Sequence, residues 1–201
     1  SEGSDYLGHI VISDEVKPDS KEAIADLKAL GIAKTVMLTG DRREIAESVG
    51  RELGLNEVHA ELMPDGKVRD VESLLAKGGT LAFVGDGIND APSLALSDVG
   101  ISMGISGAGS SKEASDVVLV DDNPERVVEL IDISRNTRKI VIENIVFALV
   151  VKILFLSLGA VGVTGMLFAV FADVGVTIIA VLNSLRALFY KTKRDKHLAK
   201  K

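Results

Sequence analysis

Short apolar runs alternate with charged, amphipathic stretches over the first two thirds of the chain. The apolar runs predict five strands, at residues 7–13, 34–38, 80–84, 99–104 and 116–122. Apolar residues at helical spacing predict helices between them, at 17–32, 42–55, 64–78 and 91–98. Uniformly apolar strands that alternate with helices are typical of a parallel sheet with helices on both faces. We therefore predict an α/β fold for this part.

The pattern changes at Ile140, where nearly continuous apolar sequence begins and extends to Tyr190. A helix over residues 124–144 is expected to lead into it. The apolar stretch is long enough for two membrane-spanning helices of about 20 residues each. It lies far from the N-terminus, which excludes a secretory signal. We therefore predict a C-terminal transmembrane helical hairpin after the α/β part.

Composition narrows the range of functions. The formal net charge is −6, and no basic stripe runs through the first two thirds, so we expect no nucleic-acid partner. The chain has no cysteine, which excludes disulfides and thiolate metal ligands within it.

Acidic and amide side chains follow the strand predicted at residues 80–84. The motif GDGIND contains Asp86, Asn89 and Asp90. Mg2+ prefers oxygen ligands and usually takes one or two carboxylates, which Asp86 and Asp90 can supply. The amide of Asn89 can donate a hydrogen bond to a phosphate oxygen. Two acids and an amide at the end of an apolar strand reduce stability unless they have a function. We therefore predict a site for Mg2+ and a phosphoryl group.

A second polar turn, Thr39-Gly40-Asp41, follows the strand at residues 34–38. Sites in parallel sheets lie beyond the carboxyl ends of the strands, which would bring this turn near the GDGIND motif. The hydroxyl and N–H of Thr39 can bind phosphate, and Lys67 can add a positive charge. Gly40 and Asp41 are candidate catalytic residues together with Thr39, Lys67 and Asn89. Asp41 could instead cap the following helix, and Lys67 could be an ordinary surface residue.

The motifs MLTGD, PDGK and VGDGINDAPSL, in this order, resemble the phosphorylation domain of P-type ATPases, which has a haloacid dehalogenase-like fold. The match covers nearly the whole chain. The resemblance implies that Thr39, Lys67 and Asn89 hold the phosphoryl group while Asp86 and Asp90 bind or position Mg2+. It also implies ATP as the substrate of the full-length protein.

The family's phosphorylated aspartate lies in an Asp-Lys-Thr-Gly-Thr motif, which this chain does not contain. Asp14 is a poor substitute, because related phosphatases have an acid two residues later and position 16 is Val. The segment DEVKP resembles the family's hinge instead. With Ser1 as the first residue, we expect the C-terminal portion of a pump, inactive by itself. We expect four parts. Residues 1–13 are a remnant of the nucleotide-binding domain or hinge, and residues 14–133 are a phosphorylation domain without its nucleophile strand. Residues 134–194 form a linker helix and two transmembrane helices, and residues 195–201 form a basic cytoplasmic tail.

Lys152 and Asp173 are ionisable residues in the interior of the apolar stretch. Charges inside a bilayer are costly and indicate function, and these two fall near mid-depth, where they could pair across the hairpin. A purely structural ion pair is the alternative. Together with LNSLRAL, they resemble exporters of Zn2+, Cd2+ or Pb2+ in the heavy-metal group. The resemblance implies that Asp173 is a ligand of the transported metal and Lys152 its counter-ion.

Basic residues flank the apolar stretch on both sides, which predicts that the phosphorylation domain and the C-terminus are cytoplasmic. We expect a multi-pass protein of the cell membrane whose partners are the bilayer, the metal and the remaining domains of the pump. His9, His59 and His197 are interpreted as surface residues. Two alternatives are a membrane-anchored phosphatase of the same fold and a non-enzymatic membrane protein derived from a pump.

Overall fold

The computed structural model describes residues 16–85, 88–104, 113–162, 165–190 and 192. The chain divides into two compact units, one up to Glu125 and the other from Arg126 onward.

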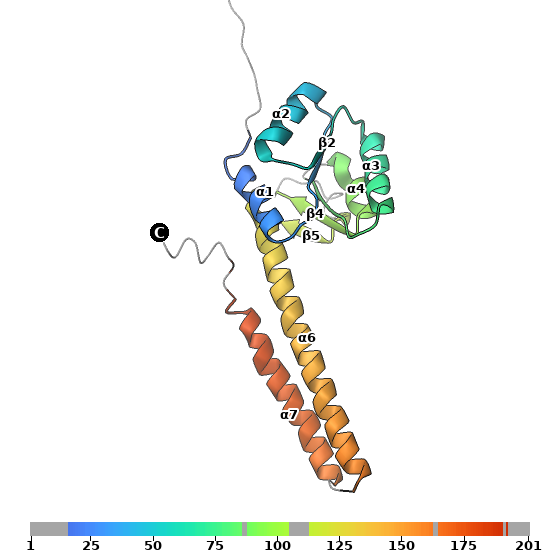
Figure 1. Ribbon diagram of the computed structural model, residues 1–201, viewed down its shortest axis with the longest axis vertical. Helices are drawn as coiled ribbons and strands as arrows, with labels where there is room; N and C mark the ends of the chain where they lie inside the picture. The colour runs from blue at the N-terminus through green and yellow to red at the C-terminus, as the bar shows by residue number, and fades with distance from the viewer. Residues whose placement is uncertain (1–15, 86–87, 105–112, 163–164, 191, 193–201) are drawn as a thin grey trace, which may run out of the picture. The chain divides into compact units, whose positions relative to one another are not determined.

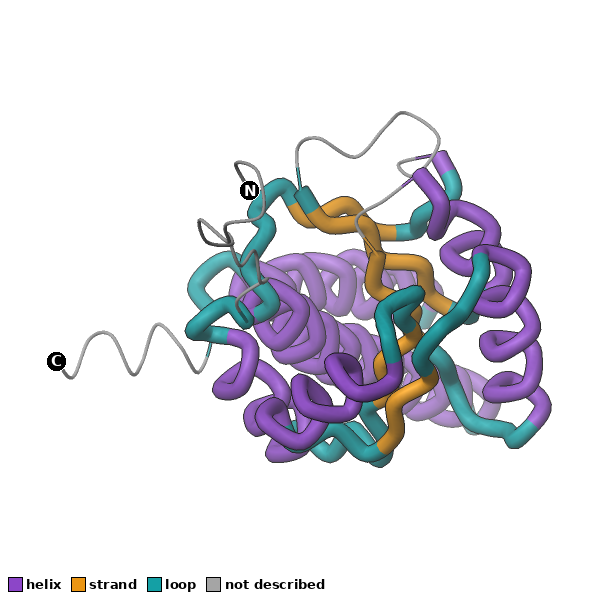
Figure 2. Tube along the Cα trace, turned by 90° about the horizontal axis from the view of Figure 1, so that it is seen from above, coloured by secondary structure: helices purple, strands orange, loops and turns teal. Residues whose placement is uncertain are grey.

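The described part of the first unit contains five short strands, all of them parallel to their neighbours. They are β1 (Val36–Leu38), β2 (Glu57–His59), β3 (Ala82–Gly85), β4 (Val99–Met103) and β5 (Val117–Leu119). Strands β1 and β2 form one sheet, and β3, β4 and β5 form another in that order. Helices of this unit flank the strands, which are orange in Figure 2. Parallel sheets with helices confirm the predicted α/β class.

The helices that the structure describes in this unit are α1 (Ser20–Ala29), α2 (Arg43–Leu53), α3 (Pro64–Ala76), the short 3-10 helix η1 (Ile88–Asp90) and α4 (Ala91–Leu96). Helix α2 ends at Gly54, whose φ of 71° is readily adopted by glycine. Gly31, with φ 82°, follows α1 in the same way. A glycine with positive φ therefore lies at the C-terminal end of both helices.

The strands differ from the prediction in two respects. Strand β2 was not predicted, because Glu-Val-His has a single apolar residue and offers no apolar run. The described strands also form two sheets where a single one was expected, since no described strand pairs with both β1 and β3. The strand predicted at residues 7–13 lies outside the described residues.

Helix α4 packs very closely on β4 in the core of this unit. A Cβ on Gly100 would lie 2.6 Å from the carbonyl oxygen of Leu94, so only glycine allows this approach. Leu94 and Ser93 on α4 are almost fully buried, as is Ile101 on β4. This packing holds η1, which carries Asn89 and Asp90 and contacts α4, close to the sheet.

The second unit is built from two long helices that lie side by side (Figure 1). Helix α6 runs without interruption from Glu125 to Ala160, and α7 spans Met166–Ser184 and continues into the short helix η2 (Leu185–Ala187). The expected linker helix and the first apolar helix are thus one element. Among the described helices, α6 is the one long and apolar enough to cross a membrane.

Polar side chains join α6 to α7 near the end of α7. The Asn144 amide donates to the Ala180 carbonyl at 3.2 Å and to the Ser184 hydroxyl at 2.9 Å. Asn183 donates in turn to Asn144 Oδ1 at 2.8 Å. Hydrogen bonds of this kind stabilise helix pairs in apolar surroundings, where there is no hydrophobic driving force between the helices.

Candidate functional site

The turn after β1 is attached to the segment after β2 by three backbone hydrogen bonds. The N–H of Thr39 donates to the His59 carbonyl at 2.9 Å, and the N–H groups of Glu61 and Leu62 donate to the carbonyls of Asp41 and Thr39 at 2.9 and 3.0 Å. Glu61 is the one described non-glycine residue with positive φ, 61°. The polar turn is therefore held in a defined position beside the start of α3.

Within this turn, Thr39 and Asp41 bind each other. The Thr39 hydroxyl donates to Asp41 Oδ2 at 2.7 Å and accepts from the Asp41 N–H at 3.1 Å. Helix α2 begins after Arg42 with no side-chain cap, so the capping alternative for Asp41 is wrong. A Cβ on Gly40 would lie 3.2 Å from the Leu62 carbonyl oxygen, a tight contact that favours glycine.

Lys67 and Asp90 form an ion pair between the first turn of α3 and the segment after β3. Lys67 Nζ donates to Asp90 Oδ1 at 2.8 Å, and the two side chains are 21% and 12% exposed. A surface lysine, the alternative for Lys67, is therefore excluded. Charged hydrogen bonds this well shielded from water are stronger than surface pairs.

Gly85, the last residue of β3, makes room for the Asp90 carboxylate. A Cβ at this position would lie 2.9 Å from Asp90 Oδ2, 3.0 Å from Asp90 Cβ and 3.1 Å from Phe83 Cε1. Any larger residue would push the carboxylate away from Lys67. The glycine of the motif thus has a steric role in the site.

The structure brings the two motifs to the carboxyl ends of the strands, as the sequence predicts. Leu62, which binds the turn after β1, lies five residues before Lys67, and Lys67 binds Asp90. The Asn89 side chain is exposed and has no hydrogen-bond partner within the described residues. Asp86 and Asp14 lie outside the described residues.

The described part of the site meets some of the requirements of Mg2+. Asp90 is a carboxylate at the end of β3, with Oδ1 bound by Lys67 and Oδ2 above Gly85. Mg2+ takes as few as one or two carboxylates and retains water, so Asp90 fits as one ligand or as a positioning group. Within the described ranges, no group of three acidic or histidine side chains gathers around a common point.

His59 differs from the surface residue that was expected. Its Nδ1 lies 2.8 Å from Asp70 Oδ2 on α3, and its side chain is 29% exposed. It therefore joins β2 to α3 beside the site. Next to it, Lys34 lies 2.6 Å from Glu57 and lowers the pKa of that carboxyl group. His9 and His197 lie outside the described residues.

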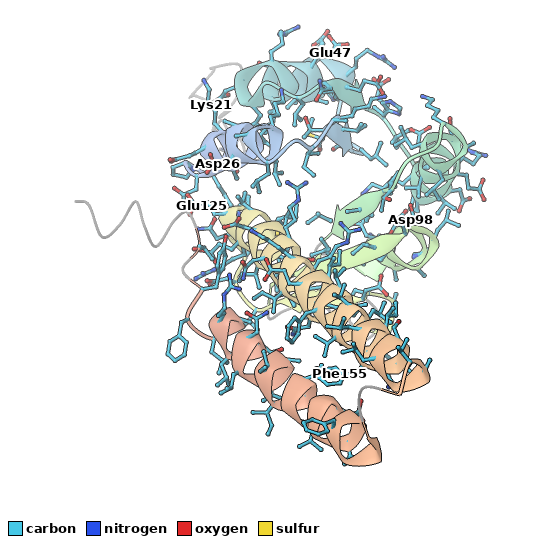
Figure 3. The ribbon with its side chains drawn as sticks, turned by 60° about the horizontal axis from the view of Figure 1, so that its bottom comes forward. Lys21, Asp26, Glu47, Asp98, Glu125 and Phe155 are labelled. Atoms are coloured by element: carbon cyan, nitrogen blue, oxygen red, sulfur yellow. The ribbon has the colours of Figure 1, made fainter. Side chains whose placement is uncertain are left out.

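In the second unit, Lys152 on α6 lies opposite Asp173 on α7. Lys152 Nζ is 3.5 Å from Asp173 Oδ1, a long separation for a hydrogen bond, and both side chains are more than two-thirds exposed. The pair lines a groove of about 1000 Å3 between the helices. Phe155 of α6 lines it too (Figure 3). The arrangement offers a loosely paired carboxylate in otherwise apolar surroundings.

Sequence reasoning did not find the polar contacts of Asn144, Asn183 and Ser184, or the Arg186–Glu143 ion pair at 3.1 Å. The sequence does contain a signal for these contacts, because the polar residues that make them interrupt an otherwise apolar stretch. Their partners are about 40 positions apart, however, and only the pairing of the helices identifies them.

Residues 2–98 match the family model of haloacid dehalogenase-like hydrolases. The chain is 52% identical over 191 residues to a cadmium, zinc and cobalt-transporting ATPase of Bacillus subtilis (strain 168), a match that covers 94% of the chain and 27% of that protein. It is also 52% identical over 183 residues to a zinc-transporting ATPase of Synechocystis sp. (strain ATCC 27184 / PCC 6803 / Kazusa), covering 90% of the chain and 25% of the relative. The chain thus spans about a quarter of the length of these curated relatives.

Among solved structures, a zinc-transporting PIB-type ATPase in its E2.Pi state superimposes with a TM-score of 0.82 at 40% identity. That match covers 87% of this chain and 28% of the other. The resemblance found in the three motifs is confirmed by these matches. The chain therefore belongs to the PIB-type P-type ATPases, and it corresponds to a C-terminal part that includes the haloacid dehalogenase-like domain.

Proposed function

We propose that the first unit holds the phosphoryl group in an ATP-driven heavy-metal exporter that works through an aspartyl phosphate. The Lys67–Asp90 pair at the end of β3 carries this proposal. A shielded lysine next to a phosphoryl group stabilises the negative charge on its oxygens during transfer. Asp90 holds that lysine in place. The turn after β1, which is hydrogen-bonded to Leu62 shortly before α3, carries the Thr39 hydroxyl.

Asp90 and Asp86 are the residues that would hold Mg2+, which would neutralise phosphate oxygens when bound. Asn89 adds an exposed amide that can donate to a phosphate oxygen. Nucleotide binding and the acceptor aspartate are assigned to the whole protein, since this chain contains no Asp-Lys-Thr-Gly-Thr motif. We expect the 201-residue chain alone to form no phosphoenzyme.

We propose Zn2+ or Cd2+ as the transported ion, with Asp173 as a ligand and Lys152 as its counter-ion. The relatives whose names include zinc and cadmium support this choice. The 3.5 Å separation also supports it, because a carboxylate that is loosely paired can exchange its lysine for a metal ion. The Lys152 ammonium would then balance the carboxylate after the metal leaves.

We further propose that α6 and α7 cross the cell membrane as a hairpin, with the first unit and the C-terminus in the cytoplasm. The apolar length of α6 supports this for the first helix. The basic residues on both flanks support the orientation. Exposed charges at Lys152 and Asp173 would be costly against lipid, so the remaining helices of the pump are expected to cover them.

The test uses the full-length pump with the substitution Asp173→Ala. Metal-stimulated ATPase activity should be lost, while phosphoenzyme formation from inorganic phosphate should remain, because the phosphoryl site is in another unit. Ser157→Ala is the matched control, since the one hydrogen bond of the Ser157 hydroxyl within the described residues is to the Ile153 carbonyl of its own helix, at 2.8 Å. If Asp173→Ala/Lys152→Ala recovers metal stimulation, the pair is structural and the ligand assignment is wrong.

A further inference from the structure

Three cationic side chains lie on one face of α6 just before its apolar part begins. Arg135, Arg138 and Lys139 are exposed, and their spacing of three and four residues places them on neighbouring turns. Arg138 and Lys139 have no ion-pair or hydrogen-bond partner in the part of the chain that the structure describes. Arg186, by contrast, binds Glu143 at 3.1 Å. The two free cations are therefore available to a ligand.

The same face continues as a shallow, open apolar groove of about 850 Å3, and all of its lining residues belong to α6. Besides the cations and Glu143, it is lined by Ile142, Val146, Phe147 and Val150, all of them exposed. At a rise of 1.5 Å per residue, Lys139 and Val150 are about 16 Å apart along the helix. The paired Glu143 adds little repulsion to an anion at the cationic end. The groove thus combines a positively charged mouth with an apolar body the length of an acyl chain.

We propose that this groove binds an anionic phospholipid of the cytoplasmic leaflet, with its phosphate at Arg138 and Lys139 and an acyl chain along Phe147 and Val150. The inference rests on the proposed membrane placement of α6. Charge complementarity favours an anionic headgroup, because the cationic group of a zwitterionic headgroup would be repelled by Arg138 and Lys139. Basic clusters immediately cytoplasmic of a membrane helix attract anionic lipid in this way.

The test uses the absence of tryptophan from the chain. Phe147→Trp introduces a single fluorescent reporter into the groove of the 201-residue chain, reconstituted in phosphatidylcholine vesicles. Brominated phosphatidylglycerol and brominated phosphatidylcholine are added in separate samples at equal mole fraction, and tryptophan quenching is measured. The anionic quencher should be the more effective one. Phe168→Trp, an exposed position on α7, is the control and should respond equally to both.

Arg138→Gln/Lys139→Gln in the Phe147→Trp chain should abolish the preference, which we expect to be about fivefold per cation. Lys21→Gln/Lys77→Gln changes the net charge equally in the first unit and should leave the preference unchanged. Equal quenching by both lipids at position 147 overturns the lipid site. Quenching at position 168 without any at 147 also overturns it, and indicates a groove covered by protein. No quenching at either position rejects the membrane placement as well.

Discussion

The Lys67–Asp90 pair should contribute a coupling free energy of about 2 kcal/mol to the stability of the first unit. At 2.8 Å and an effective dielectric constant of about 20, the attraction is about 6 kcal/mol before desolvation. Desolvation offsets most of it, and charged hydrogen bonds retain a net value of about 1.5–3 kcal/mol. Lys67→Met alone should cost more, about 3–4 kcal/mol, because it leaves Asp90 shielded without a partner.

A double-mutant cycle of Lys67→Met and Asp90→Asn measures this coupling. Hydrogen exchange of the β3 and β4 amides, followed by mass spectrometry of the full chain in micelles, reports the free energy of unfolding of this unit. The control cycle is Arg51→Met with Glu47→Gln, an exposed pair 3.9 Å apart on α2, which should couple by less than about 0.5 kcal/mol. The reasoning is refuted if both cycles give the same coupling.

Gly85→Ala tests the same pair without removing either charge. Its new methyl group must displace the Asp90 carboxylate, which it would otherwise approach to 2.9 Å. The loss of stability should therefore shrink when Gly85→Ala is introduced into the Lys67→Met background, since no ion pair remains to be broken. An equal loss in both backgrounds would contradict the steric role of Gly85.

Two further predictions concern packing and titration. Gly50→Ala should destabilise the first unit by about 1–3 kcal/mol in urea unfolding, because the new Cβ collides with Val58 Cγ2. In a Val58→Ala background the same substitution should instead stabilise the protein, since alanine has the higher helix propensity in α2. No sign change would reject the clash. In a Tyr6→Phe chain, absorbance titration should give Tyr190 a pKa above its ordinary value, because burial and then the Asp132 carboxylate raise it. Asp132→Asn should reduce the rise without abolishing it, and the stability associated with the protonated phenol should be lost as the pH increases through the raised pKa. An ordinary pKa in the parent chain would contradict the partial burial of this tyrosine.

The order of apolar runs and polar turns in the chain was sufficient to predict the α/β class and the position of Thr39 directly after a strand. The reason is local, because apolar runs, glycine stops and turns after strands depend on residues close in sequence. The three motifs were also sufficient to indicate the correct family, since each is a continuous run of residues. Strand β2 escaped prediction because a three-residue strand with one apolar side chain carries no periodic signal.

Only the tertiary structure decided which side chains meet. Lys67 is 23 positions from Asp90, His59 binds Asp70 of another element, and Asn144 lies 39 positions from Asn183. Sequence spacing did not identify these three contacts, because they depend on how parallel strands and paired helices pack. The Lys152–Asp173 pair differs, since the similar depth of both residues in the predicted hairpin indicated it. The role of Asp41 illustrates the difference. A residue before a helix is a plausible cap from sequence alone. In the folded turn, however, the Asp41 carboxylate accepts a hydrogen bond from the Thr39 hydroxyl.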